Sequence, residues 1–131
     1  MSIIESIKNL LGFKTEIKEY QPTVKEFYQN CKVEKIQWWL SWCNKYPDLY
    51  WVRLRKFSNG KADVLFQDED KSYGFENEEF AGYFISEDEF SAFENIDEDG
   101  RNDLEIPKDV VIELPDWENK EAENFEYIGT Y

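Results

Sequence analysis

The stretch Tyr50–Gln67 constrains the fold of this chain more than any other part of the sequence. Two runs of β-branched, aromatic and aliphatic residues flank the pair Asn59-Gly60, and an Asn-Gly pair supplies the positive φ angles that a two-residue type I′ turn requires. The sequence therefore predicts a β-hairpin over 50–67 in which Ser58 pairs with Lys61.

Charge supports this register, because it places Lys56 opposite Asp63 on neighbouring strands. The register also places Arg53 and Arg55 on one face of the hairpin. That face is shared with four apolar side chains, Trp51, Phe57, Val64 and Phe66. Guanidinium groups stack on aromatic rings, and they can also pair with acids from residues 67–131. We therefore interpret the two arginines as a structural tie between the halves of the chain rather than as an anion-binding site.

Apolar residues at helical spacing predict a helix over 24–45, which ends before Pro47 because proline disfavours helical geometry at the preceding residue. The same spacing predicts a short amphipathic helix that ends before Gly12, and a weak alternation predicts a strand over 13–20. The long helix carries most of a dense tryptophan patch, made of Trp38, Trp39 and Trp42 with Trp51 nearby. Such a patch suits a buried core, a sugar-stacking platform or a partner-binding hot spot, and the sequence leaves these alternatives open.

Shorter elements are predicted after the hairpin. They are a third strand over 72–76, a helix over 87–95, a loop over 97–103 and a last strand over 109–114 between two prolines. Apolar residues within 116–131 predict that this C-terminal tail is partly docked.

Composition is compatible with one folded domain. The chain has 131 residues, of which 41% are hydrophobic and 18% aromatic, so it is long and apolar enough to bury a core. We predict a single α+β domain over 1–131. Its antiparallel sheet of about four strands is built on the 50–67 hairpin and packs against helix 24–45 and the short N-terminal helix.

The charge of the chain is strongly negative and unevenly distributed. The formal net charge is −14. Residues 1–66 hold eleven Lys or Arg against seven Asp or Glu, a net of +4, whereas residues 67–131 hold four against twenty-two, a net of −18. Such a chain repels phosphate, which argues against direct binding to nucleic acid or to an anionic membrane. It is compatible with a basic protein partner.

The sequence gives little support for catalysis. It contains no histidine, which removes the usual base for a serine or cysteine nucleophile and the commonest zinc ligand. Carboxylates and aromatic rings leave a carbohydrate-binding or carboxylate-dependent hydrolytic domain as a less favoured alternative. The acidic loop 95–105 begins like an EF-hand calcium loop, but Ile106 stands where the bidentate Glu is required. We predict no cofactor and no metal site, and leave calcium binding by this loop open.

These observations favour a small acidic protein-binding module that is not an enzyme and that binds a basic protein. The acids expected to contact the partner are Asp68, Glu69, Asp70, Glu78, Glu79, Glu87, Asp88, Asp97, Glu98, Asp99 and Asp103. In size and charge the chain resembles bacterial immunity proteins that inhibit secreted nuclease toxins, and phage-encoded nucleic-acid mimics. The resemblance implies an inhibitor whose acids take the place of phosphates and whose aromatic residues supply affinity. A bacterial or phage interaction domain without an inhibitory role is the alternative.

The expected location is the cytoplasm. No run of the sequence reaches the roughly 18 apolar residues of a membrane span. The N-terminus lacks the basic and then apolar pattern of a signal peptide. Cys31 and Cys43 do not form a CxxC pair, and both thiols are expected to be reduced.

Overall fold

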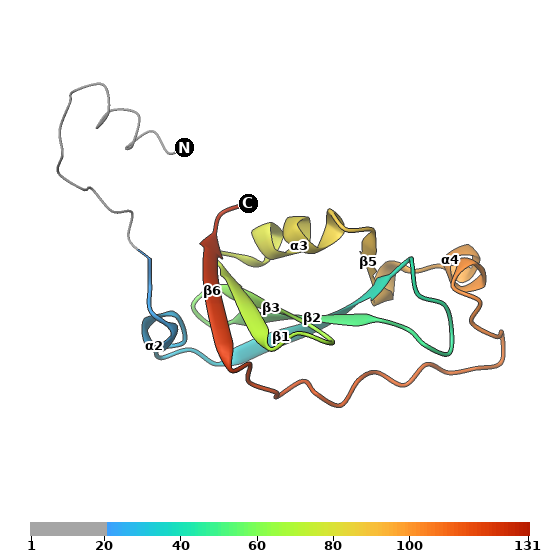
Figure 1. The fold of residues 1–131 in the computed structure, drawn as a ribbon, viewed down its shortest axis with the longest axis horizontal. Coiled ribbons are helices and arrows are strands. Elements are labelled where there is room, and N and C mark those ends of the chain that lie inside the picture. The colour runs from blue at the N-terminus through green and yellow to red at the C-terminus, as the bar shows by residue number, and fades with distance from the viewer. Residues whose placement is uncertain (1–20) are drawn as a thin grey trace, which may run out of the picture.

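The structure is a computed structural model that describes residues 21–131. These residues form a six-stranded sheet with short helices (Figure 1). In chain order the elements are α2 (Val24–Phe27), β1 (Val33–Ser41), β2 (Trp51–Phe57), β3 (Ala62–Phe66), β4 (Lys71–Phe75), α3 (Glu78–Ser86), β5 (Phe90–Ala92), the 3₁₀ helix η1 (Phe93–Asn95), α4 (Glu98–Asp103) and β6 (Asn124–Gly129). The α+β class is confirmed, while the predicted N-terminal helix and the strand over 13–20 lie outside the described residues.

The strand order is β5-β1-β2-β3-β4-β6. Neighbouring strands are antiparallel except β4 and β6, which run parallel. The predicted sheet of about four antiparallel strands is therefore too small and misses the parallel pair. The strand over 72–76 is confirmed as β4, but the strand over 109–114 is wrong, because those residues cross the sheet as an extended connection. The last strand lies instead in the tail 116–131, which docks through β6.

The predicted hairpin is present as β2 and β3, but its turn is longer than a two-residue type I′ turn. Gly60 has a φ of +88°, whereas Asn59 does not adopt a positive φ. The backbone N–H of Phe57 donates to the carbonyl of Lys61 at 2.8 Å, which leaves three residues in the loop. Such a three-residue loop is a type I turn followed by one residue in the left-handed conformation. Gly60 is that residue, so Asn59 does not need a positive φ.

The longer turn shifts the register by one residue. Arg55 therefore lies opposite Asp63, and the predicted pairing of Lys56 with Asp63 is wrong. Because side chains alternate between the two faces of a strand, the shift also reverses β3 relative to β2. The arginine face is shared with Asp63 and Leu65 and not with the predicted Val64 and Phe66.

The predicted helix over 24–45 is wrong. Only Val24–Phe27 is helical, and most of the remaining stretch is β1. Trp38 and Leu40 pack on one face of β1, while Trp39 packs on the other. Since both faces of β1 carry apolar side chains, its pattern does not alternate and imitates a wide helical stripe. The aromatic and β-branched composition is the signal that favoured a strand.

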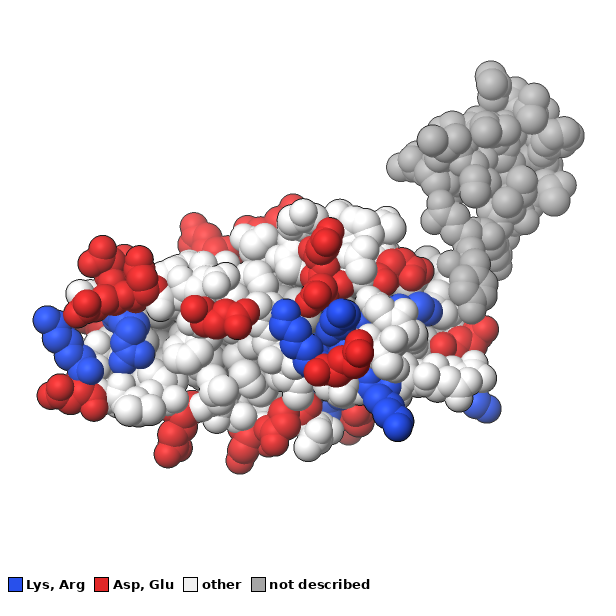
Figure 2. All heavy atoms as spheres, turned by 180° about the vertical axis from the view of Figure 1, so that it is seen from behind, with Lys and Arg blue, Asp and Glu red and all other residues white. Residues whose placement is uncertain are grey.

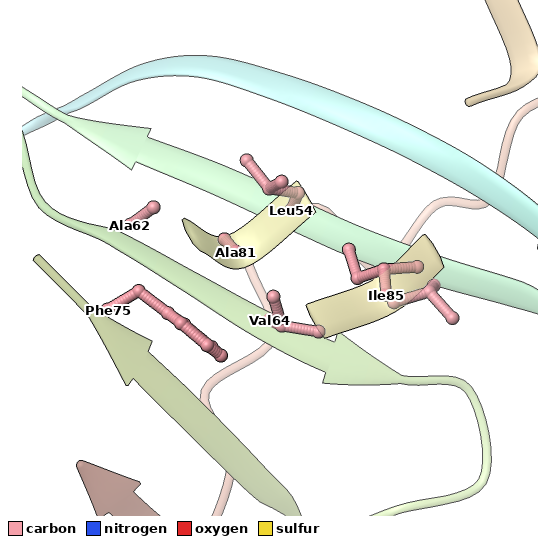
Figure 3. Close-up of a cluster of buried hydrophobic side chains, with 7 residues drawn as sticks. Leu54, Ala62, Val64, Phe75, Ala81 and Ile85 are labelled. Carbon is pink, nitrogen blue, oxygen red and sulfur yellow. The ribbon is translucent and has the colours of Figure 1, made fainter. Parts of the chain in front are cut away.

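One face of the sheet is covered by α3, which takes the place expected for helix 24–45 (Figures 1 and 3). The core between α3 and this face of the sheet consists of seven buried side chains, Val52, Leu54, Ala62, Val64, Phe75, Ala81 and Ile85. Ala81 and Ile85 come from α3 and the others from β2, β3 and β4. Burial of this apolar surface fixes α3 on the sheet.

The opposite face is covered by the extended residues 104–123, which we call the strap. Figure 1 shows the strap passing beneath the sheet from α4 to β6. Its Leu104 and Ile106 join a second core with Trp38, Leu40 and Trp51. Trp117 of the strap stands edge-on to Trp38, with ring centroids 4.7 Å apart.

Two more predictions beyond the hairpin are wrong. The helix over 87–95 is replaced by β5 and η1, because Phe90 packs beside the α3 face while Phe93 turns to the strap face. The loop over 97–103 is replaced by the short helix α4, whose first turn is capped by the Asp97 side chain.

Candidate partner-binding surface

The arginines of β2 lie buried beneath the strap. Arg55, which is 2% exposed, donates to Asp63 from Nε at 3.0 Å and from Nη2 at 2.6 Å. It also donates to Glu121 of the strap at 3.0 Å. The hydroxyl of Tyr28 donates to Asp63 at 2.8 Å and lies 3.2 Å from the hydroxyl of Ser72. The fully buried Asp63 thus accepts three hydrogen bonds and balances one buried cation.

The pKa values of this network follow from burial and charge. Burial and the neighbouring Asp63 carboxylate raise the pKa of the Tyr28 phenol. Burial alone would lower the pKa of Arg55, but its hydrogen bonds to Asp63 and Glu121 outweigh burial and raise it. The Arg55 guanidinium is therefore held in its charged form.

The side chain of Arg53 holds the strap by hydrogen bonds to backbone carbonyl oxygens of the strap. Its Nη1 donates to the carbonyl oxygens of Trp117 at 2.9 Å, Glu118 at 3.1 Å and Lys120 at 2.8 Å. Burial, together with the nearby charge of Arg55, lowers the pKa of Arg53 to about 10. Its Nε and Nη2 find no partner among the described residues. The interpretation of both arginines as a structural tie is confirmed, because they join β2 to the strap and neither is exposed.

The acids predicted to bind a partner do not form one patch. Asp68, Glu69 and Asp70 make the turn between β3 and β4, at the end of the sheet where β2 begins. The hydroxyl of Tyr50 donates to the carboxylate of Asp68 there. Figure 2 shows acidic side chains spread along the whole length of one face, with smaller groups of lysine and arginine among them.

Glu78 and Glu79 lie near the opposite end of the sheet, in the first turn of α3. Glu78 lies 3.3 Å from Lys35 near the start of β1 and 4.0 Å from Lys56 near the end of β2. These two acids are therefore separated from the others along the strand direction.

The remaining six predicted acids belong to residues 87–105, which we call the acidic shoulder. They are Glu87, Asp88, Asp97, Glu98, Asp99 and Asp103. The shoulder holds nine Asp or Glu, all exposed, and one arginine. None of the nine forms an ion pair within residues 21–131, and Arg101 donates instead to the carbonyl of Val110 at 2.8 Å. Along the chain, this dense run of acids includes β5, η1 and α4.

A groove of about 420 Å³ lies within the acidic shoulder, beside β5. Its lining includes the aromatic rings of Trp39, Trp42 and Phe90 and the polar side chains of Ser86, Asn95 and Asp97. Trp42 donates from its indole to Ser91 Oγ at 2.8 Å. Trp39 and Trp42 are half-buried here, whereas Trp38 and Trp51 belong to the core at 8% exposure.

Sequence reasoning found the tryptophans of this groove but not the groove. The signal was the run Trp38-Trp39-Trp42, which a strand divides between two faces and a helix would not. Asn95 was singled out only as the first position of the EF-hand-like loop. Ser86 and Ser91 gave no signal for a groove, because polar residues of these types occur throughout the exposed surface.

A second hollow, of about 340 Å³, lies between residues 46–51 and the strap. Each of the two hollows contains one carboxylate, Asp97 in the groove and Glu113 here. Hydrolysis by two carboxylates requires both in a single site. Across residues 21–131, no group of three or more His, Cys, Asp or Glu side chains is arranged to hold a metal ion.

Comparison of the chain with protein-family models, curated proteins and solved structures finds no match, so no relative supplies a function for it. None of the helices between residues 21 and 131 has the length and apolar character needed to cross a membrane.

Proposed function

We propose that this chain is a protein-binding module that neutralises a basic protein, acting as an inhibitor of the immunity type on a partner such as a nuclease toxin. The observation that carries this proposal is the acidic shoulder, whose nine exposed acids have no ion-pair partner within residues 21–131. Arg53 and Arg55, the arginines closest in sequence to the change of sign, are buried and form no ion pair with an acid of the shoulder.

Electrostatic attraction is the physical reason for a basic partner to bind this surface. Like charges held close together repel one another, and an oppositely charged surface relieves that repulsion. A concentrated negative field also steers a basic protein toward the surface and raises its association rate at low salt. The carboxylates can occupy positions that a nuclease uses for phosphates, while the half-buried Trp39 and Trp42 beside them supply apolar contact.

The proposed inhibitor works without cofactor or metal and without catalysis of its own. We retain the cytoplasm as its expected location, where the thiols of Cys31 and Cys43, which are not joined in a disulfide, stay reduced.

The test is capture of the partner from the native host by the immobilised full-length chain at low salt, followed by elution with salt and identification. We expect a basic protein, and we expect any nuclease activity it has to be inhibited by the chain. Its association rate should fall at least about tenfold between low and high ionic strength, as electrostatic steering predicts.

Two variants with the same change in charge locate the binding surface. The shoulder variant combines Asp88→Asn, Glu98→Gln, Asp99→Asn and Asp103→Asn; the strap variant combines Asp109→Asn, Glu113→Gln, Asp116→Asn and Glu123→Gln. All eight side chains are exposed, so both variants should fold. The shoulder variant should bind the captured partner about tenfold or more weakly than the strap variant. A neutral or acidic partner, or equal affinity of the two variants, would contradict the proposal.

A further inference from the structure

Residues 110–114 of the strap have the composition of a strand, but within residues 21–131 no strand lies beside them. The sequence Val-Val-Ile-Glu-Leu is rich in β-branched residues, which favour extended backbone, and Pro115 ends it. Its side chains alternate, since Ile112 packs against the second core whereas Val111 and Glu113 are exposed. Val111 is 89% exposed and Leu114 is 51% exposed. The segment therefore places apolar surface, together with its own backbone, in solvent.

One backbone edge of this segment is open. The N–H of Val110 donates to the carbonyl of Pro107 at 3.1 Å, and the carbonyl of Val110 accepts a hydrogen bond from Arg101 at 2.8 Å. In extended backbone the N–H and C=O groups of successive residues point to opposite edges, so Val111 and Glu113 direct theirs away from Arg101. No hydrogen bond within residues 21–131 uses the backbone groups of Val111 or Glu113. Because both residues are exposed, these main-chain donors and acceptors are accessible.

The second hollow, of about 340 Å³, lies beside this segment. Its lining includes Val111 and Glu113 of the strap and, from residues 46–51, the side chains of Tyr46, Pro47, Leu49 and Trp51. In the view of Figure 1 the strap lies at the lower margin of the domain. An edge at the margin of a domain, next to a largely apolar hollow, has room for a further strand and for some of its side chains.

We propose that this edge binds an extended segment of the basic partner, which adds to residues 111–113 as a strand. The inference rests on the proposed function and says how the partner is held next to the acidic shoulder, because Arg101 of α4 joins the shoulder to Val110. Strand addition obtains affinity from main-chain hydrogen bonds and specificity from alternate side chains. Apolar side chains of the added strand lie on the side of the hollow. Its Lys or Arg side chains lie on the solvent side, where they pair with Glu113 and cover Val111 with their aliphatic stems.

Charge selects the occupant of this edge. An exposed edge of β-branched residues is a template for pairing with any other strand, including that of a second copy. A second copy would bring a formal net charge of −14 to a chain of the same charge, and like charges oppose the pairing. A basic strand instead meets Glu113 in the segment and the exposed acids of α4 close by. One cross-strand charge pair changes affinity less than about tenfold, so the strap variant, which keeps its backbone, keeps this site.

The test uses a fluorescein-labelled seven-residue peptide of alternating lysine and valine, titrated into the full-length chain at low salt. Fluorescence anisotropy gives the affinity, and exchange of backbone amide protons with water, followed by NMR, shows which N–H groups the peptide covers. At saturating peptide we expect exchange at Val111 and Glu113 to slow at least about tenfold. Exchange at Ile112 should stay unchanged, because its N–H points to the opposite edge. A peptide of alternating glutamate and valine controls for charge and should not bind.

Two variants of one residue separate the backbone of the edge from its side chain. Val111→Pro removes an N–H donor from the edge, whereas Val111→Thr keeps the donor and the β-branched shape. Both should fold, because Val111 is exposed and its N–H makes no hydrogen bond within residues 21–131. Val111→Pro should bind the peptide and the captured partner at least about tenfold more weakly than Val111→Thr. A lysine–valine peptide N-methylated at alternate residues should bind the wild type as weakly, which tests the same bonds without altering the domain.

Three results would overturn the inference. If Val111→Pro and Val111→Thr bind the captured partner equally, no strand adds here, and the comparison of the shoulder and strap variants decides the proposed function separately. If the peptide slows exchange at Ile112 as much as at Val111, or slows neither, it does not pair with this edge. If exchange at Val111 and Glu113 slows as the concentration of the chain alone is raised, the occupant is a second copy rather than a basic partner.

Discussion

Substitution of Asp63 tests whether the buried charges hold the strap face together. The carboxylate is fully buried and accepts hydrogen bonds from Arg55 at 3.0 and 2.6 Å and from Tyr28 at 2.8 Å. In Asp63→Leu, the Arg55 guanidinium would remain buried with only Glu121, whose side chain is 71% exposed. Removing one partner of a buried ion pair typically costs about 3–5 kcal/mol, because the other charge is left uncompensated.

A double-mutant cycle separates the interaction energy of Arg55 and Asp63 from the loss of packing that each substitution causes. Arg55→Met alone leaves the Asp63 carboxylate buried without its cation, so it should destabilise the domain by a similar amount. The double variant Arg55→Met with Asp63→Leu buries no unpaired charge at these positions. It should therefore lie at least about 2 kcal/mol closer to the wild type than the sum of the two single variants.

The assay is urea denaturation followed by tryptophan fluorescence, with the slope of the free energy against urea compared among all four proteins. For a domain of this size, a loss of about 3 kcal/mol should also lower the Tm by roughly 10 °C or more. The reasoning is refuted if Asp63→Leu costs less than about 1 kcal/mol, or if the two single effects simply add.

Two further predictions concern stability. Gly74→Ala should destabilise the domain by about 1–3 kcal/mol, because a Cβ there would lie 2.5 Å from the Phe125 ring and 2.9 Å from that of Phe27; thermal unfolding measures this, and an unchanged Tm would contradict it. Tyr28→Phe should flatten the loss of stability above pH 10. The raised pKa of the folded phenol stabilises the domain fully below the unfolded tyrosine value of about 10, and this contribution is lost as pH rises further. Urea midpoints of the wild type and of Tyr28→Phe, measured from pH 8 to pH 12, test this prediction. A parallel decline of the midpoint in both proteins would contradict it.

The accuracy of the sequence predictions follows from how local each signal is. The hairpin over 50–67 was predicted because Asn59-Gly60 sits between two strand-forming runs in one short stretch. Its register was missed by one residue, since a two-residue and a three-residue loop both use the same glycine. That single residue decides whether Lys56 or Arg55 faces the carboxylate of Asp63.

The elements at the sheet edges depend on contacts that the local sequence does not encode. β6 pairs in parallel with β4 after the chain has passed through α3, β5, α4 and the strap. Parallel pairing needs such a long crossover, so no turn signal announces it. β1 was mistaken for helix because its two faces are both apolar, a property that depends on α3 and the strap lying on opposite sides.

The candidate site was also predictable only in part. The acids of the shoulder were visible in the sequence as a dense run of charge, and the structure keeps them exposed. The groove could not be predicted, because Trp39 and Trp42 meet Asn95 and Asp97 only after β5 pairs with β1.

The fold also changes the meaning of the charge asymmetry. A basic first half and an acidic second half suggest that the two neutralise each other within the domain. In the structure only three of the twenty-two acids in residues 67–131, namely Glu78, Glu121 and Glu126, form ion pairs with Lys or Arg of the described part. Arg53 turns instead to backbone carbonyls, and Arg55 shares its charge with Asp63, which lies in the same half as itself. The repulsion among the remaining acids therefore stays in the free domain and lowers its stability. A partner that supplies positive charge removes this repulsion, so that the acids which weaken the free domain would strengthen the complex.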